Sequence, residues 1–124
     1  MKIFSDSFVI FLISAKVNKV YFVNEQIKSF FDKLEKGTFE EKELYILINH
    51  AIDDLEENPR RYIQIPKERW PKECVKNYGV NNFWKYDLPN GWRLIYTLRH
   101  DKVEIMSIVI EWFTHKDYEK RFGY

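Results

Sequence analysis

Two cationic side chains in the last third of the sequence have the types and spacing needed to hold a phosphate group. Lys85 lies in the run FWKYDL and Arg93 in the run GWRLIYTL, with Pro89-Asn90-Gly91 between them. On one face of a small sheet such a pair can clamp a phosphodiester, because a guanidinium donates two parallel hydrogen bonds to phosphate oxygens. Asp87 offers Arg93 a different partner across the same hairpin. The sequence leaves both pairings open.

A second cluster follows the last apolar run, where HKDY supplies His115, Lys116 and Tyr118. Histidine can take up or release a proton near neutral pH, and lysine adds another cation for phosphate. A tyrosine can orient a proton or stack on a base. In the alternative interpretation, Tyr118 packs on the core from a short C-terminal helix that His115 caps. Phe122, four residues after Tyr118, is assigned to the core.

The hydrophobic pattern predicts the register of the hairpin. With a three-residue loop, Asp87 faces Arg93 and Lys85 faces Ile95. Lys85, Asp87 and Arg93 then share one face, and the other face collects six apolar side chains, Trp84, Tyr86, Leu88, Trp92, Leu94 and Tyr96. A two-residue loop would place Lys85 and Arg93 on opposite faces, so the three-residue loop is preferred.

Other kinds of site lack their characteristic residues. Cys74 is the sole cysteine, which rules out an intramolecular disulfide and favours a reducing, cytoplasmic setting. The three histidines are not spaced as metal ligands, and there is no serine-centred nucleophile motif and no glycine-rich phosphate loop. We therefore expect neither a metal nor a cofactor.

The charge is distributed unevenly along the chain. Residues 1–58 carry 7 lysines and 11 acidic residues, a net charge of −4. Residues 59–124 carry 13 basic and 8 acidic residues, a net charge of +5. A basic second half is compatible with a phosphate-facing surface, and also with an ordinary mixed surface, since +5 is modest.

The elements that position these residues follow from periodicity and capping signals. Val17–Val23 is rich in β-branched and aromatic residues and is predicted as a strand. Asn24 can cap a helix that Gly37 ends, with an apolar stripe of Ile27, Phe30, Phe31 and Leu34. Thr38 and Glu41 form a capping box for a second helix, whose stripe is Leu44, Leu47, Ile48, Ala51 and Leu55.

The rest of the chain is predicted as a crossover and a meander. Residues 60–82 contain two prolines and a glycine turn, which predicts an ordered connection with room for one short strand. Strands over 83–88, 92–98 and 103–112 follow, and 113–124 begins with a helical turn or two. Residues 17–124 are thus predicted to form one domain, in which a strand and two helices are followed by this connection and a meander of three strands. Residues 1–16 are predicted as an N-terminal extension or an extra strand, because the apolar run Phe8–Ile13 is too short to span a bilayer.

This order of elements, with WKYDLPNGWRLIYTL, DKVEIMSIVIEW and HKDY in succession, resembles the RelE/ParE toxin superfamily of toxin–antitoxin systems. The resemblance runs from Val17 to the C-terminus and is most specific at Gly91–Tyr96, a Gly-aromatic-Arg step followed by two apolar residues and Tyr. It implies a RelE-like α+β fold, with two N-terminal helices packed on a twisted, mainly antiparallel sheet that ends in a three-stranded meander. In the RelE branch it also implies a metal-independent mRNA endonuclease, in which the ribose 2′-OH attacks the adjacent phosphate.

The resemblance also implies roles for individual residues. Lys85 matches a basic residue of the first hairpin strand, and Arg93 matches the family's phosphate-binding arginine. His115, Lys116 and Tyr118 fall near the terminal cluster that assists the proton transfers. Asp87 departs from the pattern, because a second lysine often occurs there, and arginine is common where Lys116 stands.

The expected function is therefore that of the toxin in a toxin–antitoxin pair, an mRNA interferase with Lys85, Arg93, His115 and Tyr118 as catalytic residues and Lys116 and Arg93 as substrate-binding residues. The expected partners are a cognate antitoxin protein, mRNA and, in the manner of many RelE proteins, the ribosome. No membrane partner is expected. The alternatives are a ParE-like toxin that inhibits DNA gyrase and a catalytically degenerate module that only binds a partner.

Overall fold

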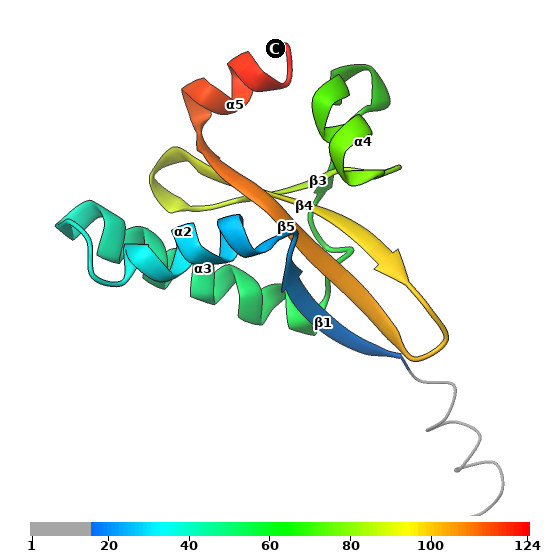
Figure 1. Ribbon diagram of the computed structural model, residues 1–124, viewed down its shortest axis with the longest axis horizontal. Helices are drawn as coiled ribbons and strands as arrows, with labels where there is room; N and C mark the ends of the chain where they lie inside the picture. The colour runs from blue at the N-terminus through cyan, green and yellow to red at the C-terminus, as the bar shows by residue number, and fades with distance from the viewer. Residues whose placement is uncertain (1–15) are drawn as a thin grey trace, which may run out of the picture.

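The computed structural model describes residues 16–124, and the prediction for the N-terminal segment lies outside them apart from Lys16. The elements, in chain order, are β1 (Val17–Phe22), α2 (Glu25–Leu34), α3 (Phe39–Glu57), β2 (Ile63–Gln64), α4 (Lys72–Tyr78), β3 (Trp84–Asp87), β4 (Trp92–His100), β5 (Glu104–Thr114) and α5 (His115–Arg121) (Figure 1). Helices and strands together give an α+β protein. Within residues 16–124, no helix is both long and apolar enough to cross a membrane.

The two N-terminal helices begin where the capping signals predict. The Asn24 side chain accepts a hydrogen bond from the Ile27 amide and starts α2. Thr38 and Glu41 form the complete capping box of α3, with both reciprocal hydrogen bonds present. These caps satisfy amide groups that the first helical turn leaves without a partner.

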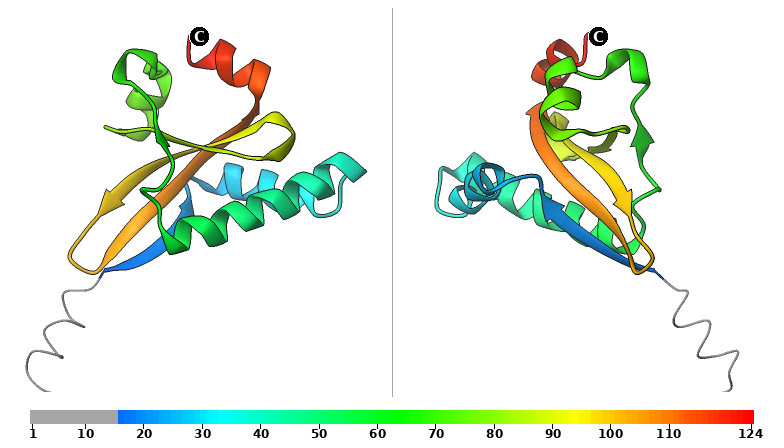
Figure 2. Two further views of the ribbon diagram at one scale, coloured as in Figure 1. Left: turned by 180° about the vertical axis from the view of Figure 1, so that it is seen from behind. Right: turned by 45° about the vertical axis from the view of Figure 1, so that its right-hand side comes forward.

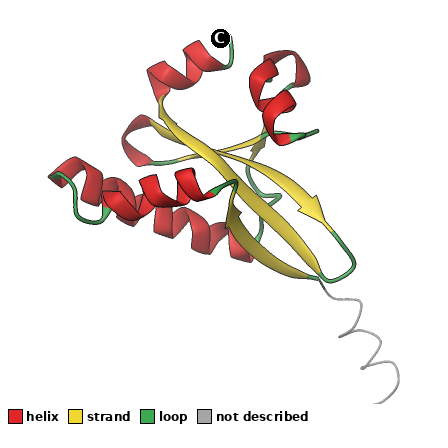
Figure 3. Ribbon diagram, in the orientation of Figure 1, coloured by secondary structure: helices red, strands yellow, loops and turns green. Residues whose placement is uncertain are grey.

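Five strands form one mixed sheet in the order β1-β5-β4-β3-β2. Strand β1 runs parallel to β5, and the other three neighbouring pairs are antiparallel. Strand β5 is long and twisted and lies between β1 and β4 (Figure 3). The predicted hairpin register is confirmed, because Asp87 pairs with Arg93 and Lys85 pairs with Ile95. In its loop Asn90 and Gly91 both adopt positive φ values, of 63° and 80°.

Helices α2 and α3 pack on one face of the sheet. The buried residues of this first core come from both helices and from the sheet, namely Phe31, Leu34, Leu44, Ile48, Ala51, Leu55, Leu88, Leu94, Tyr96 and Val109. Trp84, Tyr86 and Trp92 are partly buried against it, so the six apolar hairpin residues do share one face. Phe30, expected in the stripe of α2, is instead 45% exposed.

The opposite face of the sheet carries a second core, which no periodic pattern in the sequence predicts. It consists of Ile65, Cys74, Val80, Phe83, Ile95, Ile110, Tyr118 and Phe122. Helices α4 and α5 cover it, on the other side of the sheet from α2 and α3 (Figure 2). Helix α4 corrects the interpretation of residues 60–82, which contain the short strand β2 and this unpredicted helix between Pro71 and Gly79. Pro71 is the N-cap of this helix and Gly79, in the left-handed conformation, is its C-cap. The sequence pattern interpreted the same two residues as interruptions of a connection.

Strand β5 contains an irregularity beside β4. The pairing moves from Tyr96 opposite Val109 to Ile95 opposite Glu111, so Ile110 is skipped. An extra residue in one strand breaks the regular alternation of side chains. Trp112 thus packs with the first core and Phe113 with the second, while Glu111 lies at the edge between them.

Candidate functional site

The hairpin brings Lys85 and Arg93 to the same side of the sheet, and Asp87 lies between them. Arg93 Nε is 2.9 Å from Asp87 Oδ1, and Lys85 Nζ is 3.5 Å from the same oxygen. The side chains of Lys85 and Arg93 are only 20% and 15% exposed, whereas that of Asp87 is 43% exposed. Both interpretations of Arg93 therefore have support, since it pairs with Asp87 and also stands beside a second cation.

The contact between Arg93 and Asp87 is a pairing of charges with poor hydrogen-bond geometry. The buried Nε–H has no acceptor in line with it within the described chain. Arg93 donates instead from Nη1 to its neighbour's carbonyl, Trp92 O, at 3.2 Å. A guanidinium that is incompletely satisfied retains capacity to donate to a phosphate oxygen.

His115 joins this cluster from the first turn of α5. Thr114 caps the helix by accepting a hydrogen bond from the Asp117 amide, which fixes where the helix begins. His115 Nδ1 lies 2.9 Å from Arg93 Nη2, and Nε2 lies 2.9 Å from Glu119 Oε1. A β-carbon placed on Gly91 would be 3.8 Å from that of His115, so the hairpin loop and the start of α5 lie side by side.

Tyr118 is part of the second core. Its side chain is 3% exposed, and its ring stacks on that of Phe122 with 4.8 Å between the ring centres. Lys85 Nζ lies 5.1 Å from the centre of the Tyr118 ring. Burial is the main cause that raises the pKa of the Tyr118 phenol, and the neighbouring Tyr124 hydroxyl raises it further. Its own hydroxyl has no hydrogen bond of good geometry within residues 16–124. This position favours the core role for Tyr118 over stacking on a base, and Phe122 is buried as predicted.

Lys116 stays outside the network. Its side chain is exposed and makes no hydrogen bond or ion pair with any described residue, although His115 precedes it directly. His50 and His100 are also exposed, and His100 contacts Lys16 at the far end of β4. The structure therefore joins three of the five predicted site residues, Lys85, Arg93 and His115, by contacts. Tyr118 lies beneath Lys85.

Glu119 belongs to the cluster but was missed from the sequence. The sequence spacing could have predicted this contact, because residues four apart on a helix lie on the same side and His115 and Glu119 have that spacing. With Asp87 and Glu119 present, the two cations are matched by two carboxylates. The described residues hold no group of three or more histidine, cysteine or acidic side chains that could bind a metal.

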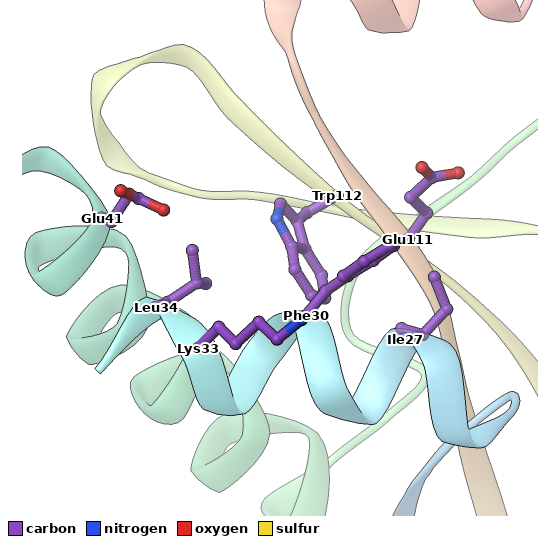
Figure 4. Close-up of a pocket in the computed structure, with 7 residues that line it drawn as sticks. All are labelled: Ile27, Phe30, Lys33, Leu34, Glu41, Glu111 and Trp112. Atoms are coloured by element: carbon purple, nitrogen blue, oxygen red, sulfur yellow. The ribbon is translucent and has the colours of Figure 1, made fainter. Parts of the chain in front are cut away.

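A separate pocket lies between α2 and β5, away from the cationic residues. Its volume is about 290 Å³, and its lining comprises Ile27, Phe30, Lys33, Leu34, Glu41, Glu111 and Trp112. Figure 4 shows the Glu111 carboxylate pointing away from α2, while Trp112 lies over the helix. Burial raises the pKa of Glu111, and the charge of Arg121 partly offsets that shift.

No protein-family model, no curated protein and no solved structure matches the chain.

Proposed function

We propose that this chain is the toxin of a toxin–antitoxin pair of the RelE/ParE type and that it cleaves mRNA without a metal. One observation carries the proposal, the convergence of Lys85 from β3, Arg93 from β4 and His115 from α5. Two cations and an imidazole are the groups that a 2′-OH attack on a phosphodiester needs. The sequence resemblance over Gly91–Tyr96 adds independent support, because Arg93 is its central residue.

The proposed reaction takes one proton from the 2′-OH, gives one to O5′ and exchanges one bond at phosphorus. His115 accepts the 2′-OH proton, and the 2′-oxygen attacks the adjacent phosphorus. Arg93 and Lys85 stabilise the charge that develops on the phosphate oxygens. The bond from phosphorus to O5′ breaks with its electron pair on O5′, which takes a proton from water. The hydroxide left behind takes the proton that His115 holds, so the neutral imidazole is restored. The products are a 2′,3′-cyclic phosphate and a 5′-OH end.

The remaining residues take supporting roles. Lys116 is exposed beside His115 and would contact a neighbouring phosphate. Tyr118 places its ring beneath Lys85 Nζ and thereby limits where the ammonium can lie. A cognate antitoxin would inhibit by covering the cationic side of the hairpin, and ribosome-bound message is the substrate that the resemblance suggests.

Asp87 and Glu119 favour a second candidate, a module that binds a partner without cleaving RNA. Each carboxylate already pairs with a cation or with His115, so an incoming phosphate meets a cluster with little net charge. Productive binding requires Asp87 to leave Arg93. Its side chain is 43% exposed and near the hairpin loop, so it has space to turn toward solvent.

The decisive test is expression of the wild type and Arg93→Ala in a host without the antitoxin, with mapping of RNA 5′ ends. New 5′-OH ends within translated messages are expected for the wild type. Because Arg93 is one of the two described cations that this proposal places at the phosphate, we expect the variant to lose at least about 100-fold in cleavage, as for a removed transition-state donor. Arg99→Ala is the matched control, since Arg99 is on the same strand, is exposed and donates to Tyr78 O.

Three results would contradict this assignment. Full cleavage by a folded Arg93→Ala protein would exclude the arginine from the site. Growth arrest with intact RNA would favour a ParE-like toxin that acts on gyrase, and no arrest would favour the module that only binds. A thermal unfolding curve of each purified variant separates loss of function from loss of fold.

A further inference from the structure

Both ring nitrogens of His115 have a partner of known hydrogen-bonding character. Arg93 Nη2 lies 2.9 Å from Nδ1, and Glu119 Oε1 lies 2.9 Å from Nε2. A guanidinium nitrogen can only donate, and an ionised carboxylate can only accept. These two facts fix the tautomer, because Nδ1 must be the acceptor and Nε2 must carry the hydrogen.

We infer that Glu119 is a positioning residue that holds His115 as the Nε2–H tautomer and makes Nδ1 the atom that accepts the substrate proton. The chemical part of this inference rests on the proposed function, whereas the tautomer follows from the two contacts alone. Glu119 needs no contact with RNA for this role. It acts through the imidazole, one helical turn earlier on α5.

The position of Nδ1 suits a proton acceptor at a phosphate held by Arg93. When a phosphate oxygen replaces Nδ1 as the acceptor for Arg93 Nη2, the Nδ1 lone pair becomes free beside that phosphate. The 2′-OH then gives its proton to Nδ1 and its oxygen bonds to phosphorus. The electron pair of the broken bond goes to O5′, which takes a proton from water, and the hydroxide left behind later takes the proton from the imidazolium. The resulting imidazolium keeps its Nε2–H bond to the Glu119 carboxylate, so the new positive charge has a partner.

Solvent access agrees with this assignment. The side chain of His115 is 57% exposed and that of Glu119 is 47% exposed, so substrate can reach the ring. An exposed ion pair on a helix restrains the ring only weakly by itself. Arg93 supplies the second restraint, from a largely buried side chain on a different element.

The test uses the purified full chain with ¹⁵N-labelled histidine and long-range ¹H–¹⁵N spectra at a pH where the imidazole is uncharged. For His115 the wild type should show one tautomer, with a protonated Nε2 and an unprotonated Nδ1. In Glu119→Ala only Arg93 restrains the exposed ring, so the share of the Nε2–H tautomer should fall below that of the wild type. Glu119→Gln keeps an acceptor and should retain the wild-type pattern. His50 and His100 serve as internal references, and Asp117→Asn removes a nearby α5 carboxylate as a matched control.

Cleavage of a short RNA by the same four proteins measures the chemical part. We expect Glu119→Ala to lower kcat roughly ten-fold, below the loss of about 100-fold or more for a missing proton acceptor, with KM little changed. Glu119→Gln should recover part of that loss. Asp117→Asn should cleave like the wild type. Equal kcat for Glu119→Ala and the wild type would overturn the positioning role.

The two readouts separate this inference from the proposed function. A wild-type spectrum with the hydrogen on Nδ1 would overturn the inference even if RNA is cleaved. Absence of cleavage by the wild type would overturn the proposed reaction, and with it the use of Nδ1. The spectrum would still decide whether Glu119 and Arg93 fix the tautomer.

Discussion

The two faces of the sheet are covered in different ways, and the candidate site belongs to one of them. Helices α2 and α3 close the first face with an apolar core whose periodicity is visible in the sequence. Helices α4 and α5, each of seven residues, close the second face over a smaller core. The charged cluster of Lys85, Arg93 and His115 lies beside α5, where that second core ends.

This difference suggests a division of roles between the two faces. Long capped helices bury a continuous apolar stripe, and such burial is the main source of helical stability in proteins. Short helices contribute less by themselves, and their positions depend on a few large side chains such as Phe83 and Phe122. His115, at the start of α5, is therefore only as well positioned as those aromatic contacts allow.

The largest expected effect comes from emptying each core in turn. Phe83→Ala should lower the free energy of unfolding by about 3–5 kcal/mol and Leu55→Ala by about 2–5 kcal/mol, since both side chains are fully buried. The variants should differ in what they loosen. The rings of Phe83 and Phe122, the latter at the end of α5, have their centres 6.1 Å apart. Phe83→Ala should therefore raise the rate of amide hydrogen exchange in α5, whereas Leu55→Ala should leave it unchanged.

Urea unfolding gives the stabilities, and exchange at low urea gives the local effect. Equal exchange in α5 for the two variants would show that the faces do not behave as separate units. One cooperative core would then support both pairs of helices, and the two faces would not have separate roles.

The fold of the first face could be predicted from the sequence because its signals are local. Asn24, Thr38 and Glu41 are capping residues within one turn of the helices they start. The hairpin register followed from requiring six apolar residues to share a face. The second face could not be predicted in this way, because Phe83, Ile95 and Phe122 come from distant segments and form no periodic run.

The candidate site was predictable to a similar extent. Residue types and the hairpin register placed Lys85, Asp87 and Arg93 together, which the ion pairs bear out. The contact of Arg93 with His115 joins positions 22 residues apart and depends on how α5 leaves β5. Burial of Tyr118 depends on the second core, so nothing local to HKDY could decide between its two roles.

Two buried tyrosines give a smaller and sharper comparison of the faces. Tyr96, on the first face, donates from its hydroxyl to Pro59 O at 2.7 Å, whereas the Tyr118 hydroxyl on the second face lacks a well-aligned partner. Tyr96→Phe should therefore cost about 1–3 kcal/mol, because it leaves a buried carbonyl unpaired. Tyr118→Phe should change stability by less than about 0.5 kcal/mol or increase it, because a desolvated hydroxyl is removed.

Urea midpoints of the two variants measure this difference, and RNA cleavage adds a second criterion. If Tyr118 supports Lys85 through its ring, Tyr118→Phe should cleave like the wild type, since phenylalanine also offers a ring face to the ammonium. A loss of cleavage with unchanged stability would return the hydroxyl to the catalytic role that the sequence resemblance implies.

The smallest expected effect concerns Glu111, at the edge between the two cores. Burial raises the pKa of its carboxyl in the folded protein, so the ionised form is less stable there than in the unfolded chain. The penalty is fully present above the folded-state pKa and disappears below the unfolded-state pKa of about 4.3. Glu111→Gln should therefore be more stable than the wild type at neutral pH, and the two should converge as the pH falls through that window.

Urea unfolding of both proteins between neutral and acidic pH measures the convergence, with the exposed Glu68→Gln as the matched control. A stability gain that persists unchanged in acid would mean that side-chain shape, and not charge, limits this position. If the gain disappears on acidification as expected, the charge of Glu111 is a cost borne by the folded protein. That cost arises where β5 skips a residue beside β4 and passes from one core to the other.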